Sequence, residues 1–290
     1  MTKERTATRH VAECRYPNVA APVVVLCLAA VLSSGCSPGA IETKPPVNVD
    51  NDGLAPDMAA LARTDHIALL EHCLRNARGR YASYTCTFTK QEKLGKMMRP
   101  RQVIDVKFLN EPFSVAMVWR ENAPAGDRLL YVEGRYGGKM LVRPKGGVAR
   151  FLVGNSLLKD PAGPEAMQNT LRPVTMFGFE RGLENLLKVY RAASEAGDLK
   201  TEYGGKVKLP ETGRTAIKLT RILPEGKGYP CHRTDIYIDT EWLVPVRIDG
   251  FDSRGEQISH YAYSDVDFGA KLTEKDFTPA ACGIEPPRGE

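Results

Sequence analysis

About ten short segments in which apolar and polar residues alternate constrain the fold of this chain more than any other feature. In one of the earliest, Tyr84, Cys86 and Phe88 alternate with threonines. A period of two places alternate side chains on opposite faces of a β-strand, and threonine and aromatic residues favour strands. The other predicted strands cover 104–108, 113–119, 128–133, 139–143, 206–208, 216–223, 234–239, 243–251 and 256–268. Because most connections have hairpin length, the series predicts one large antiparallel sheet.

Two amphipathic segments interrupt the strands and predict helices over about 65–77 and 180–196. Apolar residues recur at helical spacing in both segments. They are Ile67, Leu70, Cys73, Leu74 and Ala77 in the first, and Leu183, Leu186, Leu187, Tyr190 and Ala193 in the second. A sheet of about ten strands curls and has two faces to bury, and two helices can cover only one of them. We therefore expect an α+β fold, a half-barrel with two helices on its concave face.

The first 36 residues have the pattern of a bacterial export signal. A basic segment precedes a 14-residue apolar run, Val19 to Leu32, and Ser33-Ser34-Gly35-Cys36 follows. A membrane-spanning helix needs about 20 apolar residues, so the run suits a signal peptide better than a transmembrane anchor. The small residues before Cys36 predict cleavage there and acylation of its thiol. Ser33 stands where lipoprotein signals carry a large aliphatic residue, so cleavage by ordinary signal peptidase is the alternative.

Four parts follow from this pattern. Residues 1–35 are a lipoprotein-type signal peptide, and residues 36–62, rich in proline, asparagine and aspartate, are a disordered tether. Residues 63–282 are the folded domain and residues 283–290 a tail. The predicted location is the periplasmic side of the cell envelope, with a lipid anchor in a membrane. The outer membrane is favoured over the inner one because a serine, not an aspartate, follows Cys36.

The charges and cysteines exclude several classes of partner. Residues 1–35 hold four basic and two acidic residues of the totals of 40 and 35, so the mature chain keeps 36 and 33, a net charge of +3. This balance predicts no nucleic-acid partner. Four cysteines remain after Cys36, and none forms a CxxC pair. They permit two disulfides, with Cys73–Cys86 the favoured pair, and buried free thiols are the alternative.

Motifs of catalysis and metal binding do not occur in the sequence. The nucleophile elbow GxSxG, the zinc motif HExxH and the phosphate loops GxxxxGK[ST] and GxGxxG are all missing. Ser156 and Lys159 form an S-x-x-K pair, but the S-D-N and K-T-G elements that this chemistry requires do not accompany it. We therefore expect no enzymatic activity, no cofactor and no metal site.

A series of short motifs closes the chain. They are Asp235-Ile-Tyr-Ile-Asp239, Val244-Pro245-Val246-Arg247, Tyr261-x-Tyr263-x-Asp265-Val266 and Leu272-x-x-x-Asp276-Phe277. This pattern resembles the closing strands of the LolA/LolB-like lipoprotein-carrier superfamily. More narrowly, residues 64–280 are similar to an uncharacterised family of exported bacterial proteins. The resemblance implies a curled antiparallel sheet around a hydrophobic cavity, in proteins that carry or anchor lipoproteins or sense envelope stress.

These features together predict a non-catalytic, membrane-anchored envelope protein that binds lipid or lipoprotein acyl chains. The expected lining of its cavity is Leu74, Phe88, Val106, Phe108, Met117, Trp119, Leu183, Leu187 and Tyr190. The alternative is an envelope sensor or protein-interaction module with a packed core, which would bind an envelope protein through a sheet edge or the convex face.

Overall fold

The computed structural model describes residues 47–48, 56–148 and 155–285. The chain divides into two units, 1–39 and 40–290, and every described residue lies in the second. The predicted signal peptide and the acylation site Cys36 fall outside the described residues. Within the described ranges, no helix is both long and apolar enough to cross a membrane.

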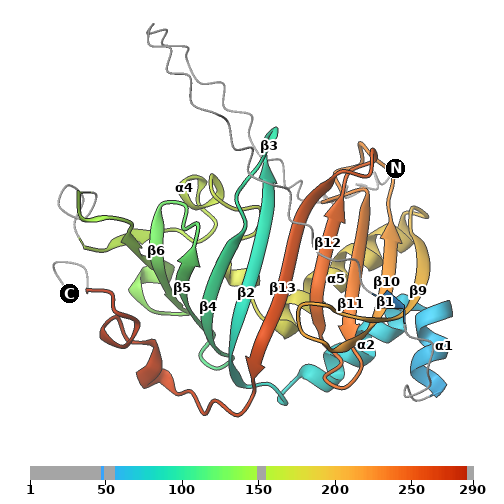
Figure 1. Ribbon diagram of the computed structural model, residues 1–290, viewed down its shortest axis with the longest axis horizontal. Coiled ribbons are helices and arrows are strands. Elements are labelled where there is room, and N and C mark those ends of the chain that lie inside the picture. Colours follow the sequence, from blue (N-terminus) through green and yellow to red (C-terminus); the bar gives the residue numbers. More distant parts are fainter. Residues whose placement is uncertain (1–46, 49–55, 149–154, 286–290) are drawn as a thin grey trace, which may run out of the picture. The chain divides into compact units, whose positions relative to one another are not determined.

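The described strands form one antiparallel sheet of thirteen strands (Figure 1). They are β1 (Val47–Asn48), β2 (Ser83–Leu94), β3 (Met97–Met98), β4 (Gln102–Leu109), β5 (Ser114–Glu121), β6 (Gly126–Val132), β7 (Met140–Pro144), β8 (Leu157–Lys159), β9 (Lys200–Lys208), β10 (Thr215–Ile222), β11 (Arg233–Asp239), β12 (Pro245–Phe251) and β13 (Gln257–Asp267). Their order is β1-β9-β10-β11-β12-β13-β2-β4-β5-β6-β7-β8, with β3 beside β2. The sheet stays open, because β1 and β8 stand at its opposite ends. The predicted large antiparallel sheet is confirmed.

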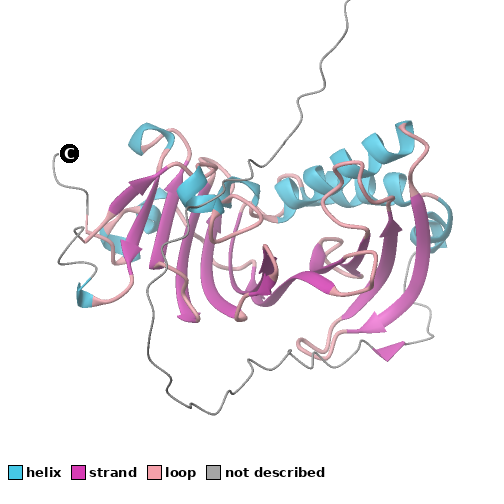
Figure 2. Cartoon of the chain, turned by 90° about the horizontal axis from the view of Figure 1, so that it is seen from above, coloured by secondary structure: helices cyan, strands magenta, loops and turns pink. Residues whose placement is uncertain are grey.

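The helices lie on the inner side of this curved sheet (Figure 2). They are α1 (Pro56–Thr64), α2 (His66–Ala77), α4 (Pro164–Met167) and α5 (Phe179–Glu195). The described residues also form the 3₁₀ turns η1 (Tyr136–Gly138), η2 (Val174–Met176), η3 (Glu274–Phe277) and η4 (Ala280–Cys282), which lie in the connections. Both predicted helices are confirmed. The Asp65 carboxylate caps α2 by accepting a hydrogen bond from the Ala68 amide at 2.9 Å. Gly197, with φ of +70°, follows the last residues of α5.

The core has two parts, one on each face of the sheet. The larger cluster lies between the helices and the concave face and includes Tyr84, Leu183 and Tyr190. A smaller cluster on the other face consists of Leu109, Ala116, Leu130, Val132 and Leu141 with Phe277, Cys282 and Ile284. The segment that contains η3 and η4 thus covers part of the face that two helices cannot reach. Ile284 is only 2% exposed, so the folded domain extends past the boundary predicted at residue 282.

The start of the domain also differs from the prediction. Helix α1 occupies residues predicted to be a disordered tether, and β1 pairs with β9 within the same stretch. Met58 and Ala62 lie at i and i+4 and are buried in the larger cluster, with Leu61 packed beside them. The prediction of disorder is therefore wrong for residues 56–62. The prediction extended the proline-rich and polar composition of the preceding residues over a short helix that has an apolar face.

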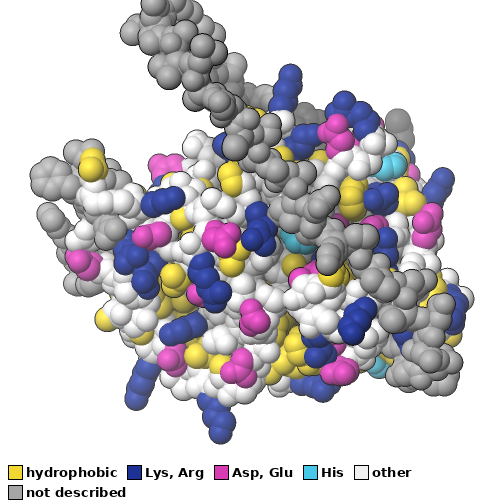
Figure 3. Space-filling model, in the orientation of Figure 1, with side chains coloured by type: hydrophobic (Ala, Val, Ile, Leu, Met, Phe, Trp, Pro, Cys, Tyr) yellow, Lys and Arg dark blue, Asp and Glu magenta, His cyan; other side chains and the backbone are white. Residues whose placement is uncertain are grey.

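The outer face of the sheet carries mixed charges. On the face drawn in Figure 3, basic and acidic side chains are interspersed over the described part of the chain. One pair is Lys93 with Glu256, whose Nζ and Oε2 atoms lie 2.7 Å apart. This pattern agrees with the small net charge of residues 36–290.

Candidate ligand-binding cavity

A cavity of about 220 Å³ lies between the concave face of the sheet, helix α5 and the segment 159–177. Ten neighbouring strands, from β10 through β2 to β8, contribute residues to its wall. Most of the residues that line the cavity are apolar. The large apolar side chains, from the strands, α5 and the segment 159–177, are Phe88, Ile104, Met117, Trp119, Leu129, Met140, Val142, Val174, Met176, Phe177, Leu186, Val189 and Ile248.

Strand alternation explains which side chains reach the cavity. On β5, Met117 and Trp119 line it, whereas Ala116 lies in the cluster on the opposite face. On β4, Ile104 pairs with Trp119 and lines the same wall. The period of two that predicts the strands therefore also selects their contribution to the cavity.

The segment from Lys159 to Phe177 closes the cavity opposite the sheet. It contains α4 and η2, and its residues Ala166, Thr170 and Val174 line the wall. No regular structure was predicted for this stretch. The length of this segment could have indicated a functional role, because irregular connections longer than about 12–15 residues are uncommon in compact domains and often functional.

The structure separates the nine predicted lining residues into two groups. Phe88, Met117 and Trp119 line the cavity. Six others are buried in the larger core cluster and lie outside the cavity wall: Leu74, Val106, Phe108, Leu183, Leu187 and Tyr190. On α5, Leu183, Leu187 and Tyr190 of the predicted stripe pack in that cluster. The residues of α5 that line the cavity are Gly182, Asn185, Leu186 and Val189, and Leu186 is the only one of them that belongs to the predicted stripe.

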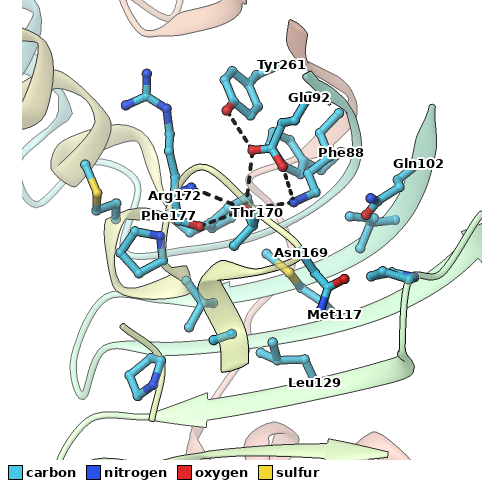
Figure 4. Close-up of a pocket in the computed structure, with 18 of the residues that line it drawn as sticks. Phe88, Glu92, Gln102, Met117, Leu129, Asn169, Thr170, Arg172, Phe177 and Tyr261 are labelled. Atoms are coloured by element: carbon cyan, nitrogen blue, oxygen red, sulfur yellow. Dashed lines mark hydrogen bonds and ion pairs between the residues drawn. The ribbon is translucent and has the colours of Figure 1, made fainter. Parts of the chain in front are cut away.

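A buried polar cluster around Glu92 holds one side of the cavity together (Figure 4). The Tyr261 hydroxyl donates to Glu92 Oε1 at 2.7 Å, and the Thr170 hydroxyl donates to the same atom at 3.3 Å. Lys90 Nζ lies 3.1 Å from Glu92 Oε2 and donates to Thr170 Oγ1 at 3.0 Å. Burial, together with the Glu92 charge, raises the pKa of Tyr261, so this phenol remains a donor. The cluster joins β2, β13 and the closing segment.

Two further pairs engage polar groups of the wall. Trp119 Nε1 donates to Gln102 Oε1 at 2.7 Å. Lys159 Nζ lies 3.3 Å from Glu165 Oε2, within the closing segment. Such pairing lets an apolar cavity carry polar side chains without leaving them unsatisfied. The arrangement can shield an apolar chain from water while a few polar groups fix its position.

None of the described cysteines lines the cavity, although the Cys231 thiol lies 3.0 Å from the Oγ1 atom of Thr234 in its wall. The predicted Cys73–Cys86 disulfide is not formed, because both residues are buried free thiols, as is Cys282. Burial raises the pKa of the Cys73 thiol to about 12 and raises that of Cys86 as well, so both thiols are held protonated. Within the described ranges, no group of three or more histidine, cysteine, aspartate or glutamate side chains could hold a metal ion.

Comparison with known proteins identifies a family that matches most of this chain. A family model described as "Protein of unknown function (DUF1571)" matches residues 81–282. No protein of curated function matches the sequence.

Several solved structures have a similar backbone fold at low sequence identity. A LolA superfamily protein from Nitrosomonas europaea is 10% identical, with 74% of this chain and 97% of that chain covered and a TM-score of 0.32. The Mycobacterium tuberculosis lipoprotein LppX is 15% identical, with coverage of 71% and 96% and a TM-score of 0.41. The Pseudomonas aeruginosa MucA/MucB complex gives 14%, a TM-score of 0.44 and coverage of 76% of this chain but only 62% of that one.

Proposed function

The chain belongs to the DUF1571 family of proteins of unknown function, and we propose that it binds the acyl chain of a lipid or lipoprotein without catalysing a reaction. The observation that carries this proposal is the cavity of about 220 Å³ with its mainly apolar wall. Ligand sites are typically preformed, largely apolar and fitted with few polar groups. This cavity is preformed and its wall is largely apolar.

Burial of the chain supplies the affinity. Each methylene group transferred from water into an apolar site contributes about 0.8 kcal/mol. A dry apolar cavity of about 150 Å³ is already large enough to admit benzene. Met117, Met140 and Met176 line the wall, and methionine side chains adapt to irregular apolar ligands.

The proposed setting is the periplasmic side of the cell envelope. An acyl group on Cys36 would anchor the chain to a membrane, with the outer membrane favoured, and the folded domain would receive its ligand there. The basic segment and short apolar run at the N-terminus support export. The order of events is export, anchoring and then uptake of the acyl chain.

Gly182 offers a direct test of the cavity. It lies within α5 and lines the cavity, and a Cβ atom built there meets nothing within 4 Å. We expect Gly182→Leu to fill the open space and to weaken binding of the fluorescent, uncharged methyl ester of cis-parinaric acid at least tenfold. Helix propensity favours leucine over glycine by up to about 1 kcal/mol, so the variant should fold.

The matched control is Ser194→Leu, which places the same side chain at an exposed position of the same helix. Fluorescence titration should give this variant the affinity of the wild type, and thermal melts should show all three proteins folded. Failure of the wild type to bind the ester, or undiminished binding by Gly182→Leu, would remove the acyl-binding function.

A further inference from the structure

The charges that line the cavity do not balance. Six charged residues line it: Lys90, Glu92, Lys159, Glu165, Arg172 and Arg221. Two ion pairs, Lys90–Glu92 and Lys159–Glu165, account for four of them. In the described part of the chain, Arg172 and Arg221 have no carboxylate within ion-pair distance. The wall therefore carries two positive charges without an ion-pair partner, of which Arg172 is exposed to solvent and Arg221 is buried.

Arg221 is the more unusual of the two because it is almost completely buried, with 2% of its surface exposed. It projects from β10, and its Nη2 donates to Thr234 Oγ1 on β11 at 2.9 Å. Its Nε and Nη1 atoms have no hydrogen-bond partner in the described structure. Burying an ionised group is costly unless it is paired, and a guanidinium stays ionised.

The surroundings of Arg221 compensate this cost only in part. The ring of Tyr190 lies 5.1 Å from the guanidinium carbon, and the Cys231 thiol is a weak partner. Burial lowers the pKa of Arg221, and the nearby charge of Arg172 acts in the same direction. A negatively charged group in the cavity would relieve both effects. Within the described ranges, no carboxylate pairs with Arg221.

The cavity also has a direction. Arg221 belongs to β10, at one end of the row of lining strands, whereas Leu129, Met140 and Val142 belong to β6 and β7 near the other end. The last lining strand there is β8, whose Lys159 is neutralised by its ion pair with Glu165. Arg172 comes from the closing segment, and its guanidinium carbon lies 5.4 Å from the centre of the Tyr261 ring. The two ends thus suit the two halves of an amphiphile.

We infer that the ligand is an anionic amphiphile whose carboxylate or phosphate binds Arg221, assisted by Arg172, while its chain extends toward β6 and β7. This inference rests on the proposed acyl-binding function and adds the class of head group to it. A carboxylate or phosphate oxygen accepts the N–H groups that Arg221 leaves free. Charge-assisted hydrogen bonds of this kind are about twice as strong as neutral ones.

The test compares ligands that share one chain and differ in the head group. The wild type is loaded with the uncharged parinaric methyl ester, which is then displaced by oleyl alcohol, oleate or oleoyl lysophosphatidate below their micelle concentrations. We expect at least one of the two anions to displace the ester at a concentration at least tenfold lower than the alcohol requires. The preferred anion distinguishes a carboxylate from a phosphate head group.

Arg221→Met should abolish this preference and leave displacement by the alcohol unchanged. Removing an unpaired buried charge is not expected to destabilise the fold, and thermal melts verify this. Arg221→Lys, which keeps the charge, should retain part of the preference. Arg254→Met, at a residue whose side chain is 77% exposed, is the control and should behave as the wild type.

The outcomes separate the two proposals. Equal displacement by alcohol, oleate and lysophosphatidate in the wild type overturns the anionic head group and leaves acyl binding intact. A preference that persists in Arg221→Met overturns the role of this arginine. If the ester itself does not bind, acyl binding fails, and the inference fails with it.

Discussion

Replacing Glu92 by alanine is expected to lower the free energy of unfolding by about 3–5 kcal/mol, because it removes one partner of a buried ion pair. The side chain of Glu92 is 3% exposed and that of Lys90 is 11% exposed. Without the carboxylate, the Lys90 ammonium is left in the cavity wall with no opposite charge beside it. The hydroxyl groups of Tyr261 and Thr170 lose their acceptor as well.

Urea denaturation measures this loss, and two further variants identify its cause. The double change Lys90→Met with Glu92→Leu removes both charges and should be much closer to the wild type than Glu92→Ala. Glu256→Ala removes a carboxylate that is 55% exposed, and its cost should stay within about 1 kcal/mol. A Glu92→Ala protein as stable as Glu256→Ala would show that the buried cluster does not hold the closing segment.

A comparable loss, again about 3–5 kcal/mol, is expected for Asp239→Ala at the end of β11. Asp239 is fully buried, and its Oδ1 accepts hydrogen bonds from Arg214 Nη2 at 2.8 Å and from the amides of Glu241 and Trp242 at 2.9 Å. Arg214 Nε also donates to Asp239, and its guanidinium lies 3.5 Å from the centre of the Trp242 ring. The carboxylate therefore fixes both the turn after β11 and the arginine.

Glu241 provides the comparison for this prediction. It also pairs with Arg214, at 2.9 Å, but its side chain is 76% exposed. Glu241→Ala should change the free energy of unfolding by less than about 1 kcal/mol. Similar denaturation midpoints for the Asp239→Ala and Glu241→Ala proteins would contradict the structural role of Asp239.

The sequence identifies the regular elements that carry their own local signals. Helices α2 and α5 agree closely with the predicted ranges because Asp65 and Gly197 mark their ends. Strands β2, β4 to β7 and β10 to β13 follow from alternation, whereas β3 was not predicted and only residues 206–208 of β9 were. Short elements such as α1, β8 and η4 were missed because their burial depends on distant parts of the chain, as it does for Ile284 on the outer face.

The cavity was predictable only in part. Aromatic and apolar strand residues such as Phe88 and Trp119 follow from the inward face of the sheet. The charged residues of the wall did not, because charge in an alternating strand ordinarily indicates a solvent-exposed face. Yet Lys90 and Glu92 continue the period of Phe88, and Arg221 continues that of Leu219, so their inward direction was present in the spacing. On α5, choosing between two adjacent stripes required the position of the helix over the sheet.

The acyl-binding function can be tested most directly by native mass spectrometry of the protein purified from cells without added lipid. The wild type should carry an additional mass of one amphiphile that is released on denaturation, and Gly182→Leu should carry much less of it. A bare wild-type mass, combined with no binding of the parinaric ester, would contradict acyl binding in this cavity.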